Sequence, residues 1–598
     1  MESSACQSIH TLHIPVMGTG YTIDTPLRVA KYGISSVVSL VDDTLIEQMR
    51  KYHSAEAGEP YEPIRQRDED WRARRITAYL NLLDKLVARQ FDELRNSPFE
   101  PGSEITRYFN LLPDSPLRTA YFEMLACDDA ETKARMQADL RRQVAPGSID
   151  ANIMSKVDRD VYVNGRKLPV EFCDAMAALR GFANSTLRSS VVFSAGMNPR
   201  LFSYVSQFDD FYPDANGQIK KKIVLKVSDY RSAAIQGKVF AKKGLWVSEY
   251  RIESGLNCGG HAFATQGHLM GPILEEFKKN RSKLSQKLHG MYQKALVASG
   301  RPEVDEPHDV RITVQGGIGT ADENDFLLRY YEVDGTGWAT PFLLVPEVTN
   351  VDETTLRKLA AATEDDVFLS GNSPLSIPFW NLRNSASEEA RRRRIEEGKP
   401  GSTCPKCHVR LNSDFDGPPL CIASRSYQRR KLELLDTADA SPEQLPKLHA
   451  MTIAPSCICH DLAGGATIKN DIDPKATPAV CPGPGITDFS KIATLEEMIG
   501  HIMGRLSLLT NADRPHMFAR ELGIYIDHLR SETEKLAAGL SPRSMEYFHQ
   551  FKENLLNGID YYRGLAEEFV DQERNRFLDQ LADLNDILEP MLLATAEC

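Results

Sequence analysis

The stretch Val247–His268, VSEYRIESGLNCGGHAFATQGH, decides the fold that the sequence predicts. It begins as an apolar strand and then breaks at Gly255 and again at Gly259-Gly260-His261. Paired glycines let the backbone approach a ligand closely, because they carry no Cβ. A histidine just beyond such a strand occupies the position where a (β/α)8 barrel carries its catalytic groups.

Two more glycine-rich turns follow this stretch. Val314–Thr320 reads VQGGIGT, and Asp334–Phe342 reads DGTGWATPF. Backbone N–H groups at turns of this kind suit a phosphate, which is commonly bound at this end of a barrel. The order of the three segments therefore predicts one barrel face that carries a phosphate and a ring.

The three segments resemble the last three strands of the nitronate monooxygenase (2-nitropropane dioxygenase) family, which is related to flavin-dependent enoyl-ACP reductases. The matching residues are Cys258-Gly259-Gly260-His261, Gly316-Gly317-Ile318 and Ala339-Thr340-Pro341-Phe342. Cys258 stands where the family usually has Ala, and Ala339 where it usually has Gly. The resemblance covers the barrel residues only.

The resemblance implies an FMN-binding barrel in which His261 acts as general base, taking a proton α to an activating group while the flavin takes the electrons. The alternatives for His261 are a structural histidine or a hydrogen-bond partner of the flavin. The residues expected around the cofactor lie at strand ends: Met17, Gly18, Thr19, Ser194, Gly196, Lys226, Gly259, Gly260, Gly316, Gly317, Gly319, Ala339 and Thr340.

Lys226 lies inside the apolar stretch 222–228. Burying an unpaired ammonium group is costly, so this side chain needs a partner. One interpretation pairs it with a structural carboxylate. The other directs it into the barrel mouth, towards an anionic ligand or a flavin carbonyl.

Composition excludes several classes of protein. The chain has 598 residues and a net charge of -12, which disfavours general nucleic-acid binding. We find neither an apolar run long enough to span a membrane nor a secretory signal. We therefore expect a cytoplasmic protein.

We expect five segments. Residues 1–46 start the barrel, 47–147 form a helical insertion and 148–386 complete the barrel, followed by a Cys-rich metal-binding segment at 387–490 and a helical bundle at 491–598. The insertion could serve as a lid over the C-terminal barrel face, where βα loops point. A third strand is expected within Ser148–Val163, indicated by Val157, Val161 and Val163, and an eighth over 338–345.

Six of the eleven cysteines lie in the fourth segment, at Cys404, Cys407, Cys421, Cys457, Cys459 and Cys481. In a cytosolic chain such clustering indicates metal ligation before disulfides. Four of them could hold zinc or a [4Fe–4S] cluster, with His408 or His460 as a substitute ligand. A flavin on the same chain favours iron–sulfur. The alternative is that some of these cysteines are ordinary core residues.

The last segment is amphipathic, and Thr494 with Glu497 predicts a capping box. Helices of this type form core or dimer contacts, so a homodimer is one expectation.

Three functions stay open. The first is an FMN enzyme with an iron–sulfur centre, acting on a small or carrier-bound substrate with a separate electron donor. The second is a nitronate monooxygenase-type enzyme with structural zinc. The third is a non-catalytic barrel that serves as a scaffold.

Overall fold

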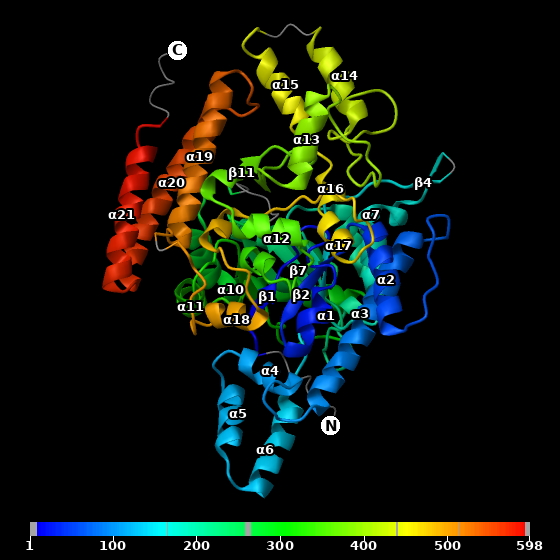
Figure 1. The fold of residues 1–598 in the computed structure, drawn as a ribbon, viewed down its shortest axis with the longest axis vertical. Coiled ribbons are helices and arrows are strands. Elements are labelled where there is room, and N and C mark those ends of the chain that lie inside the picture. Colours follow the sequence, from blue (N-terminus) through cyan, green and yellow to red (C-terminus); the bar gives the residue numbers. More distant parts are fainter. Residues whose placement is uncertain (1–8, 164, 258–264, 438–440, 512, 592–598) are drawn as a thin grey trace.

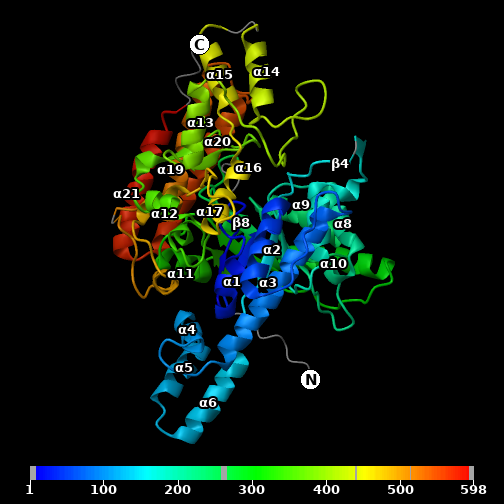
Figure 2. The ribbon, with the colours of Figure 1, turned by 45° about the vertical axis from the view of Figure 1, so that its right-hand side comes forward.

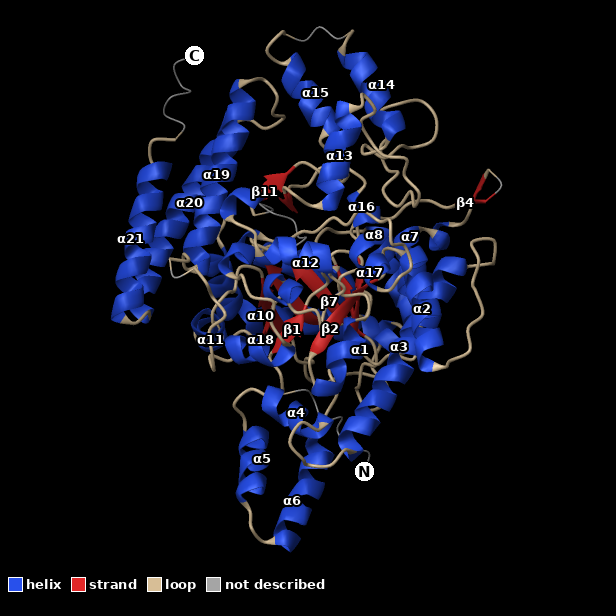
Figure 3. Ribbon diagram, viewed as in Figure 1, coloured by secondary structure: helices blue, strands red, loops and turns tan. Residues whose placement is uncertain are grey.

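The computed structural model of the chain describes residues 9–591 except 164, 258–264, 438–440 and 512. Its centre is a closed barrel of parallel strands in the order β1-β10-β9-β8-β7-β6-β3-β2, drawn in red in Figure 3. The predicted α/β barrel is therefore confirmed. The strands are β1 (Leu12–Ile14), β2 (Ser35–Ser39), β3 (Ile149–Ile153), β6 (Ser190–Phe193), β7 (Lys222–Val227), β8 (Val247–Glu253), β9 (Arg311–Gln315) and β10 (Gly335–Gly337).

Alternation along each strand separates the two barrel faces. In β7, Ile223 and Leu225 join the main core, whereas Val224 packs with Val37 and Val192 in a separate apolar cluster. Successive strand side chains point to opposite faces, which explains this division. The helices that alternate with the strands are α1 (Thr25–Val29), α2 (Asp43–Ala57), α3 (Trp71–Asn96), α7 (Asp174–Ala183), α8 (Pro199–Tyr204), α9 (Tyr230–Ala241), α10 (Met270–Ala298), α11 (Ala321–Arg329) and α12 (Glu353–Ala360).

Two predicted strands differ from the observed ones. The third strand, β3, lies within the expected range Ser148–Val163 but ends before Val157, and its polar Asp150 and Asn152 alternate with apolar residues. The eighth is β10, and the expected strand over 338–345 is instead a 3-10 helix over Thr340–Leu344 that has Pro341 in its first turn. Proline lacks an N–H for the ladder and suits the start of a helix.

Between β2 and β3 the chain forms α2 and α3, followed by α4 (Glu104–Leu111), α5 (Pro116–Ala126) and α6 (Ala130–Gln143). Figure 1 shows α4, α5 and α6 at the bottom, at the opposite end of the molecule from α13–α15. The Tyr108 hydroxyl in α4 donates to the Ala145 carbonyl (3.2 Å) and accepts from its N–H (3.1 Å), just before β3 begins. These contacts fix α4 at the N-terminal ends of the strands, so the lid expectation is wrong for α4–α6.

The Cys-rich segment covers the C-terminal ends of the strands instead. The Gly20 N–H, just beyond β1, donates to the Leu462 carbonyl at 3.1 Å. Lys406 forms an ion pair with Asp42, which follows β2. Figures 1 and 2 show α13 (Ala386–Glu396), α14 (Arg425–Leu435), α15 (Leu445–Ile453), α16 (Ile458–Asp461) and α17 (Gly464–Lys469) on this side of the barrel. Just before this segment, β11 (Val367–Ser370) pairs with β12 (Phe379–Leu382).

Four helices follow near the C-terminus. They are α18 (Leu495–Ile502), α19 (Met517–Ala537), α20 (Met545–Leu565) and α21 (Asp571–Leu588). The last three pack against one another, and α20 also contacts α10. The capping box of Thr494 and Glu497 is confirmed at the start of α18. A small hairpin of β4 (Tyr162–Val163) and β5 (Arg166–Lys167) projects from the region after β3.

Candidate functional site

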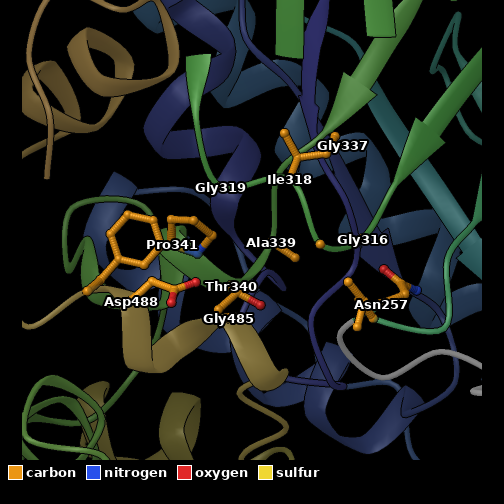
Figure 4. Close-up of a pocket in the computed structure, with 13 residues that line it drawn as sticks. Asn257, Gly316, Ile318, Gly319, Gly337, Ala339, Thr340, Pro341, Gly485 and Asp488 are labelled. Atoms are coloured by element: carbon orange, nitrogen blue, oxygen red, sulfur yellow. The ribbon is translucent and has the colours of Figure 1, made fainter. Parts of the chain in front are cut away.

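A cleft opens where β9 and β10 end. It encloses about 410 Å³, open solvent included. Figure 4 shows the turn after β9, the turn after β10 and the loop around Asp488 facing this space. The lining residues are Leu256, Asn257, Gly316, Gly317, Ile318, Gly319, Gly337, Ala339, Thr340, Pro341, Gly485, Asp488 and Phe489.

Glycine is required at two positions of the first turn. Gly316 and Gly317 have φ of +102° and +85°, in the region that L side chains rarely adopt. A Cβ on Gly316 would lie 2.9 Å from Asn257 Cα, and one on Gly317 would lie 2.4 Å from Leu256 Cδ1. The turn after β9 therefore packs closely against the residues that follow β8, against backbone at Gly316 and against the Leu256 side chain at Gly317.

The turns also present hydrogen-bond donors. Within the part of the chain that the structure describes, the N–H groups of Gly317, Ile318 and Thr340 have no hydrogen-bond partner. Unbonded backbone donors at strand ends and helix starts are suited to an anion. The predicted phosphate site at these turns stays a prediction.

Gly319 was expected to contribute to the same site, but its N–H is already hydrogen-bonded within the protein. It donates to Glu323 Oε2 at 2.8 Å, and the Arg514 guanidinium fills the space beside its Cα. Arg514 bonds to Glu323 at 2.6 Å and to Asp488 at 3.1 Å, and Arg520 also pairs with Asp488. Burial alone would raise the pKa of Glu323, but Arg514 holds it below its ordinary value.

This ion cluster therefore neutralises the carboxylate that faces the cleft. No sequence motif indicated this cluster, because Asp488 and Arg514 lie far along the chain from β9.

A polar layer lies beside the cleft, in the barrel mouth. Lys226 Nζ is 2.7 Å from Glu253 Oε1, and both side chains are buried. Glu253 also accepts from Asn257 Nδ2 at 2.6 Å and from Gln315 Nε2 at 2.9 Å. His13 Nε2 lies 3.4 Å from Gln315 Oε1. Asn257 belongs to both the layer and the cleft, so the two form one continuous site.

Both interpretations of Lys226 thus hold in part: it pairs with a carboxylate, and the pair lies in the barrel mouth. Sequence reasoning did not assign Glu253, Asn257 or Gln315 to the site. One signal was present, because Lys226 and Glu253 each end a strand of the barrel and the two strands are neighbours.

The other predicted strand-end residues are not part of the cleft. Gly18, between Met17 and Thr19, lies under Leu462 of the covering segment, whose Cδ2 would be 3.2 Å from a Cβ on this glycine. Ser194 Oγ lies 3.3 Å from Asn152 Oδ1 at the ends of β6 and β3. Gly196 packs against the Lys156 side chain.

Cys258, Gly259, Gly260 and His261 lie outside the described residues. Their role therefore stays a prediction. The described residues on either side, Asn257 and Thr265, follow β8 and precede α10.

Five of the six clustered cysteines come from one small region. Cys421 packs with Val409 and Ala423, and Cys459 lies against this group. The Cys407 N–H donates to Cys404 Sγ at 3.2 Å. A hydrogen bond with Cys457, together with burial, raises the pKa of Cys404 well above its ordinary value. Cys481 instead packs in the main core.

Their arrangement does not fit a metal as it stands. Across the described ranges, no group of three or more His, Cys, Asp or Glu side chains is placed so that it could hold a metal ion. On this geometry we derive no step through a metal.

Comparison of the sequence with models of known protein families, and with curated proteins, finds no match to either. Among the residues the structure describes, no helix combines the length and apolarity needed to cross a membrane.

Proposed function

We propose that this chain is an FMN-dependent oxidoreductase whose cofactor phosphate lies in the cleft at the ends of β9 and β10. The observation that carries the proposal is the pair of turns at Gly316–Gly319 and Ala339–Pro341, which bring unbonded N–H groups to one cleft. Phosphate sites of α/β barrels are commonly built from the loops after the last two strands. The resemblance of both turns to nitronate monooxygenases supports the same cofactor.

The residues present fit such a group. The N–H groups of Gly317, Ile318 and Thr340 would hold the phosphate, and the absence of side chains at Gly316 and Gly317 would let it approach the backbone. Arg514 and Arg520 balance the charge of Asp488 and Glu323 beside it. Bound FMN would supply two-electron redox chemistry.

The polar layer would orient the rest of the ligand. Lys226 can donate to an acceptor in the barrel mouth, because an ammonium group has three donors and Glu253 Oε1 takes one. We assign to His261 the removal of a substrate proton next to an activating group. A small or carrier-bound substrate would enter from the same face.

The test measures FMN affinity by fluorescence titration of wild type, Gly317→Ala and the control Gly300→Ala. Gly300 also has positive φ (+67°), but a Cβ there would meet nothing within 4 Å. Both variants carry about 1–2 kcal/mol of backbone strain, whereas only Gly317→Ala displaces Leu256 at the cleft. We expect FMN to bind about tenfold or more weakly to Gly317→Ala and normally to Gly300→Ala.

Equal FMN affinity of the two variants would show that the FMN phosphate does not bind in this cleft. A wild-type chain that binds no FMN would overturn the proposed function as a whole.

A further inference from the structure

The side chain of Glu521 joins α19 to both ends of the connection between β8 and α10. Glu521 is buried, and its Oε1 accepts from the Ser254 hydroxyl at 3.1 Å. Its Oε2 accepts from the Met270 N–H at 2.9 Å, and the carboxyl group also accepts from the Gly255 N–H. One carboxyl group therefore bonds to the chain where it leaves the barrel and where it re-enters a helix.

Other side chains of α19 and α20 contact the same connection. The Tyr525 hydroxyl lies 3.1 Å from Thr265 Oγ1, and Asn554 Nδ2 donates to the Gln266 carbonyl at 2.9 Å. A Cβ on Gly255 would lie 2.5 Å from the Tyr525 ring, so this glycine allows α19 to approach. The C-terminal helices are thus in direct contact with the end of β8.

The residues that follow Ser254 form one wall of the cleft. The Leu256 N–H donates to Ser254 Oγ at 3.0 Å, and the Asn257 N–H donates to the Ser254 carbonyl at 3.1 Å. Leu256 and Asn257 are the residues that pack against Gly317 and Gly316. A shift of Ser254 would therefore move Leu256 and Asn257, which line the cleft.

We propose that Glu521 is a positioning residue, which holds the end of β8 in the place that the cleft requires. It acts through Ser254 and Gly255 and does not itself line the cleft. The consequence for the cofactor rests on the proposed function, whereas the structural role does not.

The surroundings of Glu521 make this role dependent on pH. Burial raises the pKa of Glu521 to about 7. Among the described residues, the titratable groups that face it are Tyr525 on its own helix and Tyr562 on α20, and both stay neutral near pH 7 because burial raises their pKa values. If Ser254, Gly255 and Met270 separate from Glu521, which defines the open form, water reaches the carboxyl group and its pKa returns towards the ordinary value of 4.5.

In the closed form, Glu521 keeps its bonds to Ser254, Gly255 and Met270. This form therefore binds the Glu521 proton more tightly than the open form does. The free-energy difference that favours the closed form is greatest below pH 4.5, falls as the pH rises to about 7, and is constant above that value.

The experiment is amide hydrogen exchange of the full chain without added flavin, across pH 4.5 to 8 and corrected for intrinsic exchange. The variants are Glu521→Gln, and Glu388→Gln as a control for removal of another buried carboxylate, one that bonds to Asn372 and Arg391. In wild type and Glu388→Gln, exchange at 254–257 and 270–273 should rise on the order of 100-fold up to pH 7. In Glu521→Gln it should not change with pH.

A pH dependence that survives Glu521→Gln would overturn the proposal. An exchange profile of wild type that is flat from pH 4.5 to 7 would also overturn it, and this measurement does not depend on whether a variant folds. FMN titration of the same samples separates the two proposals: wild type that binds no FMN but shows the exchange profile removes the proposed function alone. Equal FMN affinity of wild type and Glu521→Gln at pH 8 would remove the effect on the cleft.

Discussion

At the scale of single residues, Lys226 shows what the sequence can predict about a buried charge. An ammonium group inside an apolar strand must be paired, and this reasoning placed Lys226 correctly at the barrel mouth. The partner could not be predicted, because it depends on the register of β7 against β8, in which Lys226 lies opposite Arg251. Glu253, two residues further along β8, is the partner.

We predict that Lys226→Met lowers the free energy of unfolding by about 3 kcal/mol, because removing one partner leaves a buried carboxylate unpaired. The double variant Lys226→Met/Glu253→Gln should be more stable than Lys226→Met, since it removes both charges. Urea unfolding measures both differences. A single variant as stable as wild type would show that Asn257 and Gln315 alone satisfy Glu253.

At the scale of elements, the predictions succeeded where a strand combines branched apolar or aromatic residues without Asp, Asn or Gly, and failed where those three residue types enter a strand. The strands near 190, 222, 247 and 311 contain no Asp, Asn or Gly. Strand β3 carries Asp150 and Asn152, and strand β10 consists of Gly335–Gly337. Such strands are defined by their neighbours in the barrel, so the sequence alone indicated other positions.

The start of α19 gives an element-scale prediction about pH. His516 caps this helix by accepting from the Phe518 N–H at 3.2 Å, and its ring packs near Phe518, Phe569 and Phe577. Burial lowers the pKa of His516 from 6.5 to about 4. As the pH falls, His516 is therefore protonated in the unfolded chain before it is protonated in the folded chain. The folded chain loses stability for this reason between pH 6.5 and 4.

We expect His516→Asn, which keeps a capping acceptor, to reduce the difference in unfolding free energy between pH 7 and pH 4.5 by up to about 3 kcal/mol. Denaturant midpoints at the two pH values measure this difference. A pH dependence equal to that of wild type would show that His516 does not titrate in this range.

At the scale of the whole molecule, the sequence predicted the barrel because glycine-rich turns follow its strands in order. What covers the barrel could not be predicted in the same way. Contacts such as Gly20 with Leu462, and Arg514 with Glu323, join residues that are far apart in the chain. They place the Cys-rich segment and the start of α19 beside the end of the barrel that holds the cleft, whereas α4–α6 lie at the opposite end of the molecule from α13–α15 (Figure 1).

The central claim is that this cleft holds a flavin. The most direct test is an absorption spectrum of the full chain purified without oxygen, followed by reconstitution with FMN and by counting of flavin, iron and zinc in the same sample. We predict flavin bands and about one FMN per chain after reconstitution. A colourless protein that takes up no FMN would contradict it, and would leave the barrel as a scaffold.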